Sequence, residues 1–234
     1  NQKFGDFEHI VVDGGSSDNT IFAIAGASDE RTLIKSEPDN GVCDAFNKGI
    51  SRCQGDVIGF LHSDDFFADD EVLLRVNQAF ESSQCDIAYG DLDYVSKDDP
   101  DKVIRHWRSG EFTPQSLGRG WMPPHPTVFI SRQFLKRVGG FDCSYKIACD
   151  YDHLIRCLTE PGVRVHYIQR TLVKMRVGGL SNGSFPRIFS KSCEDYRVIK
   201  KNKIYFWAPI LTLILKNMRK ISQFWIKNTY FENK

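Results

Sequence analysis

Two short apolar segments that lead into acidic residues constrain the fold of this chain more than any other feature. Residues 7–12 end at Asp13, and residues 56–61 lead to the pair Asp64 and Asp65. The second segment, Asp-Val-Ile-Gly-Phe-Leu, is typical of a strand buried on both faces of a parallel sheet. Patterns with helical spacing alternate with the strands, at residues 17–27, 43–53 and 69–80. This alternation predicts an α/β fold with a mostly parallel central sheet flanked by helices.

The acidic residues after these strands are candidates for a ligand site. If both strands share one parallel sheet, Asp13, Asp64 and Asp65 lie at its carboxyl edge, where open α/β sheets bind ligands. Adjacent carboxylates suit Mg²⁺ or Mn²⁺, and such a cation keeps positions open for a diphosphate. Asp64 and Asp65 could instead begin the next helix, and Asp13 could be a turn residue. We prefer the cation site because two acidic loops occur together.

Several ordered motifs resemble one known family. The motifs are Val11–Asp18, Glu37–Gly41, Asp44–Ile50 and Gly55–Asp65. They resemble family 2 glycosyltransferases, in particular bacterial polysaccharide enzymes of the colanic-acid type, and the resemblance extends over about residues 7–184. It implies a GT-A (nucleotide-diphospho-sugar transferase) fold and transfer of a sugar from a nucleoside diphosphate with inversion. Family members begin with one more strand and helix, so we expect both to be missing before Asn1.

The resemblance also implies roles for individual residues in the first half. Asp13 would recognise the base or ribose, Asp64 the ribose side, and Asp65 would coordinate the Mn²⁺ or Mg²⁺ that bridges the diphosphate. Asp44 and Lys48 would line the nucleotide pocket.

The chain departs from the family pattern at two positions. Gly14 follows Asp13 where many members have a second Asp, which leaves open whether Asp13 or a neighbour contacts the base. His62 stands where many members have Asn, and we assign it only packing or support of neighbouring residues.

A second acidic motif supplies the candidate general base. Inverting transfer needs one group to accept the proton of the acceptor hydroxyl, and a carboxylate is the usual choice. The resemblance places Asp150 in this role, ahead of Asp152. Asp150 also precedes an apolar helical pattern, so the alternative is a helix N-cap.

Two loops of the second half are weaker candidates. Trp121 and His125 lie in a stiff Pro-rich loop that resembles the family's acceptor-side loop, and either contact with the acceptor sugar or a buried plug fits them. Arg176 begins a Gly-rich segment that resembles a mobile loop closing near the donor phosphates, with an ordinary surface loop as the alternative.

The charge is distributed unevenly along the chain. The overall net charge of +1 argues against a nucleic-acid partner, yet ten basic and only three acidic residues follow Ser190. We therefore divide the chain into a GT-A catalytic domain and a tail. The ranges are 1–186 for the domain (1–100 nucleotide-sugar-binding, 101–186 acceptor-binding) and 187–234 for the basic amphipathic helical tail. The segment 204–228 suits an anionic membrane surface, or packing on the domain or a second subunit, so a homo-oligomer stays open.

These observations predict a metal-dependent inverting glycosyltransferase of bacterial surface polysaccharide synthesis. It would take a UDP-sugar donor and a glycan or glycolipid acceptor, such as one linked to polyprenyl diphosphate. Seven cysteines without a Cys-x-x-Cys pair indicate reduced thiols in a cytoplasmic protein, peripheral at the inner face of the membrane. One alternative is a sugar nucleotidyltransferase, but the chain has no Gly-rich, Lys-bearing phosphate loop near its start, which argues against this class. The other alternative is a non-catalytic membrane-associated protein on the same fold.

Overall fold

The computed structural model of the protein describes residues 2–177 and 185–222. The first half contains, in chain order, β1 (His9–Asp13), α1 (Thr20–Ala27), β2 (Thr32–Ser36), α2 (Val42–Arg52), β3 (Val57–Gly59), β4 (Asp65–Phe67) and α3 (Val72–Ser83). The second half contains β5 (Ile87–Val95), β6 (Val103–Trp107), α4 (Pro114–Gly118), η1 (His125–Thr127), β7 (Phe129–Ser131), α5 (Arg132–Val138), α6 (Cys149–Thr159), β8 (Val165–Arg176), α7 (Phe185–Lys201) and α8 (Pro209–Ser222).

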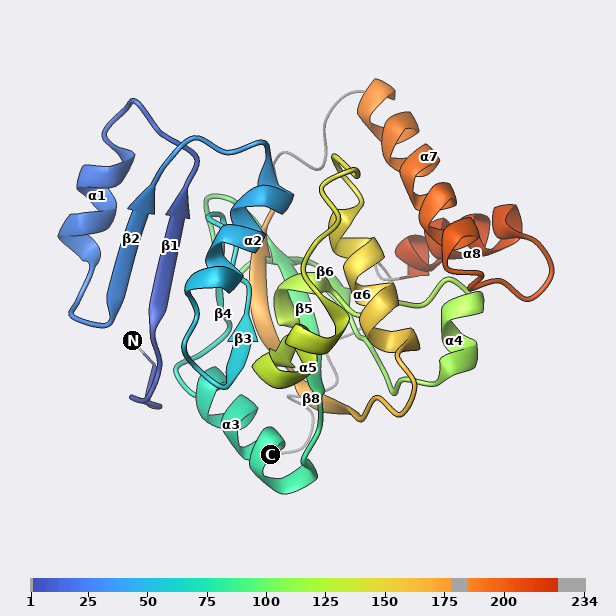
Figure 1. The fold of residues 1–234 in the computed structure, drawn as a ribbon, viewed down its shortest axis with the longest axis horizontal. Coiled ribbons are helices and arrows are strands. Elements are labelled where there is room, and N and C mark those ends of the chain that lie inside the picture. The colour runs from blue at the N-terminus through green and yellow to red at the C-terminus, as the bar shows by residue number, and fades with distance from the viewer. Residues whose placement is uncertain (1, 178–184, 223–234) are drawn as a thin grey trace.

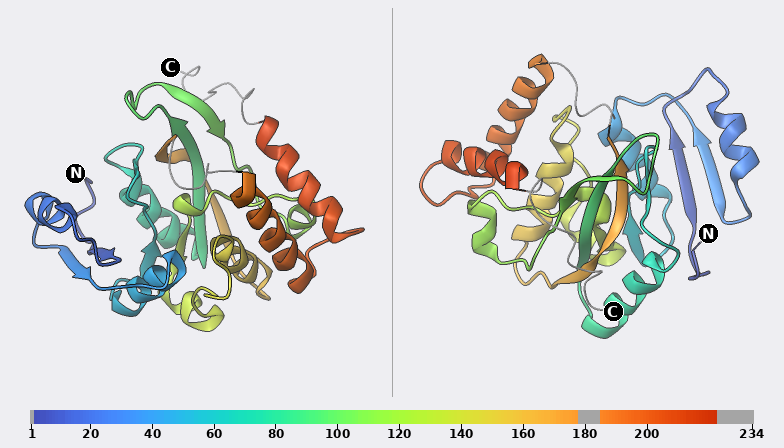
Figure 2. Two further views of the ribbon diagram at one scale, coloured as in Figure 1. Left: turned by 90° about the horizontal axis from the view of Figure 1, so that it is seen from above. Right: turned by 180° about the vertical axis from the view of Figure 1, so that it is seen from behind.

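The strands form two sheets. β1 and β2 pair in parallel, in register from His9 opposite Thr32 to Asp13 opposite Ser36. The larger sheet has the strand order β3-β7-β5-β8-β4, and β6 pairs with β5. Figure 1 shows β1, β2 and α1 at one side of the molecule and α7 and α8 at the opposite side, with the larger sheet between them. The two further views in Figure 2 show the same separation.

The expectation of a mostly parallel central sheet is wrong, because most neighbouring strands of the larger sheet run antiparallel to each other. In the described part of the chain, β5–β8 is the parallel pair of the larger sheet, whereas β3–β7, β5–β7, β5–β6 and β4–β8 are antiparallel. The apolar segment 56–61 forms the short strand β3. Ile58 packs in one core cluster and Val57 against another. A strand covered on both faces is apolar whichever way its neighbour runs, so composition alone could not reveal the direction.

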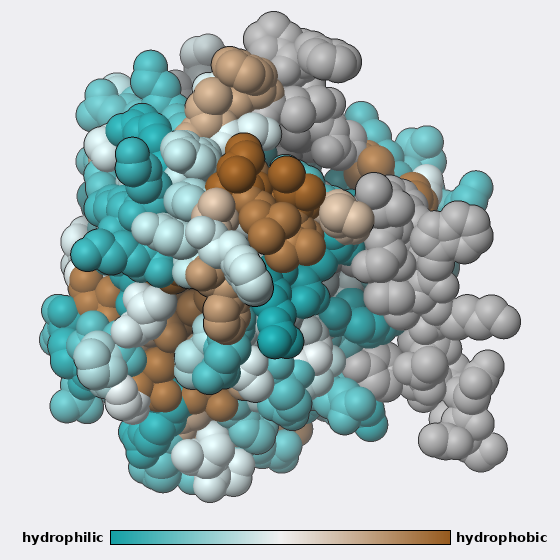
Figure 3. All heavy atoms as spheres, turned by 90° about the vertical axis from the view of Figure 1, so that its right-hand side faces the viewer, coloured by the Kyte–Doolittle hydropathy of each residue, from teal (hydrophilic) through white to brown (hydrophobic). Residues whose placement is uncertain are grey.

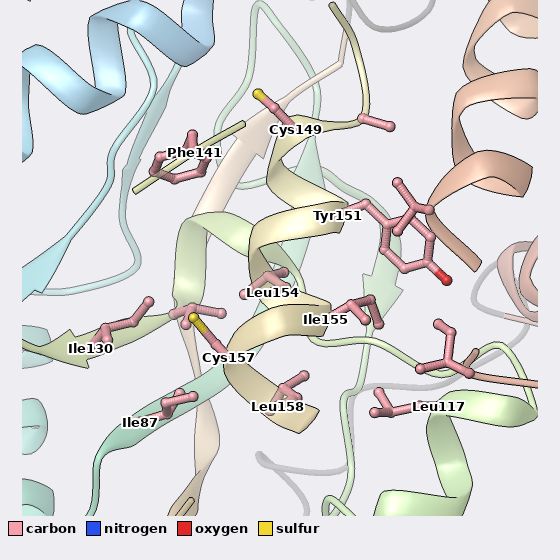
Figure 4. Packing of buried hydrophobic residues seen from close by; sticks show 14 of the residues in the cluster. Ile87, Leu117, Ile130, Phe141, Cys149, Tyr151, Leu154, Ile155, Cys157 and Leu158 are labelled. Atoms are coloured by element: carbon pink, nitrogen blue, oxygen red, sulfur yellow. The ribbon is translucent and has the colours of Figure 1, made fainter. Parts of the chain in front are cut away.

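Helix α6 lies in the main core. Figure 4 shows its residues Leu154 and Ile155 among side chains of the strands, including Ile87 and Ile130. Eight of its eleven residues are buried, so this helix has little solvent-facing surface. Its first turn is therefore held in a fixed position relative to the sheet.

The tail helices pack on the same core. Val198, Ile199, Ile204 and Leu213 belong to the cluster that contains α6. The structure thus supports the alternative in which the tail packs on the catalytic domain. Among the residues that are described, no helix combines the length and apolar character that crossing a bilayer requires.

The other side of α8 is exposed and apolar. Large apolar side chains with at least two fifths of their surface exposed lie along α8 and just before its start, and we call this set the α8 apolar face: Trp207, Ile210, Leu211, Ile214 and Met218. Figure 3 looks onto the side of the molecule that carries α7 and α8 and shows apolar residues gathered there among polar ones.

The prediction that all cysteines are reduced thiols is contradicted by one disulfide. Cys43 and Cys149 are bonded, although 106 positions separate them in the sequence. The other five cysteines are free thiols. The fold brings the first turns of α2 and α6 together, and this proximity between distant segments leaves no pattern in the sequence.

Candidate functional site

Asp13 ends β1 and organises the loop that follows. Its Oδ2 accepts hydrogen bonds from the amides of Gly15 (3.0 Å) and Ser16 (2.8 Å) and from the Ser36 hydroxyl (2.6 Å), and its Oδ1 accepts one from the Ser16 hydroxyl (2.5 Å). These bonds, led by those from the hydroxyls of Ser16 and Ser36, lower the pKa of Asp13 to about 2. A carboxylate has about four acceptor positions. These four hydrogen bonds therefore use about as many acceptor positions as the Asp13 carboxylate has, and they hold the loop in place.

A second carboxylate lies beside this loop. A Cβ added to Gly14 would lie 2.6 Å from Oδ2 of Asp39, so the absence of a side chain at Gly14 leaves room for that carboxylate. The Gly41 amide donates to the other oxygen of Asp39 at 2.8 Å. Asp39 was not among the residues predicted from the sequence, and the signal that could have indicated it is Gly14, where many members of the resembled family have Asp.

Asp44 and Lys48 hold the same region from α2. The Asp44 carboxylate accepts from the amide of Asn40 at 3.0 Å and pairs with Lys48 at 3.2 Å. Lys48 donates to the carbonyl of Pro38 at 2.7 Å. The Asn40 amide is the main cause of the lowered pKa of Asp44. The structure thus brings Asp44 and Lys48 to one side of the turn that contains Asp39.

Asp64 and Asp65 meet Arg176 where β4 pairs with β8. Asp65 is opposite Met175 in the antiparallel register, which brings the next residue, Arg176, to the acidic loop. The Arg176 guanidinium donates to the Asp64 carbonyl at 3.2 Å and lies 4.8 Å from the centre of the Phe66 ring. The expected segment that follows Arg176 includes residues 178–184, which lie outside the described residues.

Asp65 differs from Asp13 and Asp44 because one oxygen of its buried carboxylate has no hydrogen-bond partner. It is 8% exposed, and its buried Oδ2 has no hydrogen bond. Burial, together with the charge of Asp64, raises the pKa of Asp65 to about 7, against the opposing effect of Arg176. A buried carboxylate oxygen without a partner is costly, and a cation would remove that cost.

The carboxylates therefore fit a divalent cation of the Mg²⁺ or Mn²⁺ type. Within residues 2–177 and 185–222, no group of three His, Cys, Asp or Glu side chains surrounds a metal position. Asp65, with Asp64 beside it, would supply one or two oxygen ligands and leave the others to water and phosphate. Mg²⁺ is commonly bound in this way, through one or two carboxylates plus substrate phosphates.

Asp150 is the second residue of α6 and is partly exposed. Its Oδ1 accepts a hydrogen bond from the Tyr151 amide at 2.7 Å. The N-cap position is Ala148, so the alternative of Asp150 as the N-cap is wrong. Asp152 is fully buried and paired with Arg156 at 2.9 Å. Of the two candidates, Asp150 is the carboxylate that a substrate can reach.

His125 lies in an aromatic cluster, near enough to Asp150 to be affected by the charge of that carboxylate. Its ring centre is 5.5 Å from that of Phe60, 5.8 Å from that of Phe141 and 5.9 Å from that of His62. Burial lowers the pKa of His125 to about 4, although the Asp150 charge acts in the opposite direction. His125 is therefore neutral at pH 7. His62, for which only packing or support of neighbouring residues was predicted, packs beside His125.

Trp121 is a buried plug. Its side chain is 6% exposed, and its indole N–H donates to the Ser109 carbonyl at 2.7 Å. The ring contacts Tyr89 and Phe112 with centres 5.7 and 5.5 Å apart. Of the two interpretations of Trp121, the structure supports the plug, because a ring in this position has no face for a sugar.

A disulfide joins the helix that carries Asp44 (α2) to the helix that carries Asp150 (α6). Cys43 precedes Asp44 and Cys149 precedes Asp150, and the Cα atoms of the two cysteines are 6.3 Å apart. His62, two residues before Asp64, contacts His125 and is affected by the charges of both Asp150 and Asp64. The acidic loop with Asp64 and Asp65 therefore lies in the same region as the start of α6 with Asp150.

Comparison with known proteins identifies the same family for most of this region. The model of the family described as Glycosyl transferase family 2 matches residues 1–144. A PGL/p-HBAD biosynthesis glycosyltransferase of Mycobacterium bovis is 32% identical over 196 residues, which cover 81% of this chain and 73% of the relative. Chondroitin synthase of Pasteurella multocida is 28% identical over 168 residues, which cover 71% of this chain and 17% of the synthase.

Solved structures share the fold. S. aureus TarS 1–349 in complex with UDP-GlcNAc superposes with a TM-score of 0.64 at 17% identity, covering 86% of this chain and 58% of that one. The mannosyltransferase PcManGT of Pyrobaculum calidifontis, in complex with GDP-Man and Mn²⁺, has a TM-score of 0.60 at 15% identity, covering 94% of this chain and 62% of that one. These similarities confirm the expected GT-A architecture.

Proposed function

The chain belongs to glycosyl transferase family 2, and from this premise we propose that it transfers a sugar from a nucleoside-diphosphate donor to a hydroxyl group, with inversion at the anomeric carbon. The observation that carries the proposal is the unpaired, buried Oδ2 of Asp65, next to Asp64 and Arg176. A cation held there would face a diphosphate, and the Arg176 guanidinium would add positive charge beside it.

The donor is proposed to be a UDP-sugar. The S. aureus TarS structures contain UDP and UDP-GlcNAc, and the archaeal mannosyltransferase contains GDP-Man with Mn²⁺. In this chain, the loop shaped by Asp13 would contact the base or ribose. Asp39 would supply the carboxylate that the residue after Asp13 supplies in relatives, and Asp44 and Lys48 would hold the turn in which Asp39 lies.

The cation at Asp65 would be Mn²⁺ or Mg²⁺, and it would supply charge stabilisation to the departing diphosphate. The chain's own contribution is geometric. Arg176, bonded to the Asp64 carbonyl, keeps its positive charge at the carboxylate pair. The antiparallel pairing of β4 with β8 maintains this arrangement.

Asp150 is proposed as the general base. As the acceptor oxygen forms its bond to the anomeric carbon, the bond to the diphosphate breaks and the hydroxyl proton passes to the Asp150 carboxylate. Neutral His125, stacked on Phe60, lies close enough to Asp150 to be affected by its charge. The disulfide between Cys43 and Cys149 would keep the first turn of α6, which carries the base, next to α2 and its nucleotide-binding residues.

The acceptor is proposed to be a glycan or glycolipid of a bacterial surface polysaccharide, such as one carried on polyprenyl diphosphate. A relative named for PGL/p-HBAD biosynthesis and a chondroitin synthase support this class. The α8 apolar face suits the interface of an anionic membrane because basic residues adjoin it: Arg219 donates to the Arg119 carbonyl at 3.1 Å, and the Arg119 guanidinium lies 5.9 Å from the Phe206 ring. We place the enzyme at the cytoplasmic face of that membrane.

Calorimetric titration with UDP, GDP and dTDP, each with Mn²⁺, tests the donor. We expect UDP to bind most tightly, and Asp65→Asn to abolish the dependence of binding on Mn²⁺. Asp39→Asn should weaken UDP by about tenfold, the size of one charge-assisted hydrogen bond. Asp29→Asn, which removes a carboxylate paired with Arg31 just before β2, at the end of that strand away from Asp13, is the control. Failure of all three nucleotides to bind would favour the non-catalytic alternative.

Transfer or hydrolysis of the donor chosen by this titration tests the base. Asp150→Asn should reduce the rate at least 100-fold, since general bases contribute that much, while nucleotide affinity changes less than twofold. Asp56→Asn is the matched control, because the Asp56 side chain is fully exposed and weakly paired with Arg132 at 3.6 Å. An Asp150→Asn enzyme with nearly full activity would exclude this base.

A further inference from the structure

A carboxylate from the tail holds the backbone that leads to Asp150. Glu194 of α7 is 8% exposed, and its carboxylate accepts hydrogen bonds from the amides of Lys146 (3.1 Å), Ile147 (2.8 Å) and Ala148 (2.8 Å). These residues lie 46 to 48 positions earlier in the sequence and end one residue before Cys149. Both oxygens of Glu194 are engaged by this single segment.

The segment needs an external acceptor. The N–H groups at the start of a helix have no partner within the helix and are usually bound by a Ser, Thr, Asp or Asn at the N-cap. Here the N-cap is Ala148, which has no side-chain acceptor. Glu194 accepts from the amide of this N-cap residue and from the two amides before it, which have no partner within the helix, and its negative charge complements the positive end of the α6 dipole.

Other contacts fix the position of α7. Asp195, the next residue, pairs with Lys216 of α8 at 2.6 Å and with Lys191 at 3.3 Å. The Lys216 ammonium lies 3.5 Å from the centre of the ring of Tyr151, in the first turn of α6. Asp195 and the apolar core already hold α7 in place. We therefore expect the hydrogen bonds of Glu194 to matter mainly for the position of residues 146–148, just before Asp150.

We propose that Glu194 is a positioning residue for the general base: it fixes the backbone of residues 146–148 so that the Asp150 carboxylate is held toward the acceptor hydroxyl. This inference rests on the proposed function, because it takes Asp150 as the base. It makes the tail helix part of the catalytic apparatus although Glu194 touches no substrate.

The test compares Glu194→Gln with two controls on the same helix. The Gln side chain has the same length but one acceptor oxygen, so it cannot bind the Lys146 amide and the other two amides together. Asp195→Asn weakens the anchor between α7 and α8 and leaves residues 146–148 untouched. Lys191→Gln weakens the same anchor from its more exposed side and serves if Asp195→Asn does not fold.

Three quantities are measured on the full chain with the donor chosen by the nucleotide titration: kcat, the donor KM and amide hydrogen exchange. For Glu194→Gln we expect kcat to fall at least tenfold, KM to change less than twofold, and exchange of the 146–148 amides to rise at least tenfold. Both controls should keep kcat within threefold of the wild-type value, and exchange of the 146–148 amides should stay as slow as in the wild type.

Two results would overturn the inference, and they are distinguishable. If Asp150→Asn is inactive but Glu194→Gln keeps full kcat, or loses no more than a control with the same loss of melting temperature, Glu194 is merely structural and the proposed function stands. If Asp150→Asn keeps full activity, the proposed base is wrong and the inference fails with it.

Discussion

Asp13 and Asp65 show how the surroundings of a residue decide its role. Both end or begin short strands, and both are 8% exposed. Asp13 accepts four hydrogen bonds, three from its own loop and one from Ser36 of the neighbouring strand, and its pKa falls to about 2, whereas Oδ2 of Asp65 accepts none and the pKa of that carboxyl rises to about 7. The first carboxylate stabilises a loop, and the second is suited to a cation.

At the same scale, His153 predicts an acid sensitivity of the fold. The ring is fully buried and stacks on Phe141 with centres 4.2 Å apart, and burial lowers its pKa to about 3. The unfolded chain takes up a proton below the ordinary pKa of about 6.5. The neutral ring therefore contributes stability that is fully present above pH 6.5 and is lost as the pH falls toward 3.

His153→Gln removes this titration. Between pH 7.5 and 5.5, the free energy of unfolding should fall by about 1.4 kcal/mol more for the wild type than for the variant, the equivalent of one pKa unit. Urea denaturation at the two pH values measures the difference. Equal losses in both proteins would show that His153 does not titrate in this way.

At the scale of elements, the periodicity of the sequence predicted the longer helices and strands well. The expected helices 17–27, 43–53 and 69–80 agree with α1, α2 and α3, and the expected strands 7–12 and 56–61 agree with β1 and β3, each within three residues at either end. The strands β4 and β7 were not predicted. Each has three residues, too few to show the two-residue alternation of a strand, and each exists because a neighbouring strand pairs with it.

The contact between α2 and α6 makes a prediction at this scale. Without reductant, the unfolded protein should show five reactive thiols, and after reduction seven, because Cys43 and Cys149 are bonded. Titration with a chromogenic disulfide in denaturant measures both numbers. The double variant Cys43→Ser, Cys149→Ser should show five in each condition. Seven thiols in the unreduced wild type would contradict the disulfide.

At the scale of the whole molecule, the tail belongs to the core on one side and is exposed on the other. Val198 and Ile199 have no exposed surface, whereas Trp207 is 85% and Met218 58% exposed. The exposed side is the α8 apolar face. The sequence left open whether the tail packs on the rest of the chain or binds a membrane surface. In the structure, packing of the tail on the core leaves the α8 apolar face exposed.

Binding to vesicles tests that face. Vesicles containing phosphatidylglycerol should bind the wild type, and Trp207→Ser combined with Ile214→Ser should weaken binding at least tenfold, since each side chain buries apolar area. Phe22→Ser is the control, because Phe22 is 83% exposed on α1, at the opposite side of the molecule. High salt should weaken binding by the wild type. Equal binding by all three proteins would exclude this surface.

The sequence by itself determined the α/β class, the family and the acidic candidates, because apolar periodicity and ordered local motifs are properties of contiguous residues. Only the tertiary structure decided the strand directions, the bond between Cys43 and Cys149, the burial of Trp121 and the contact of Glu194 with the segment before Asp150. Each of these depends on residues far apart in the chain, and packing of the whole core brings them together.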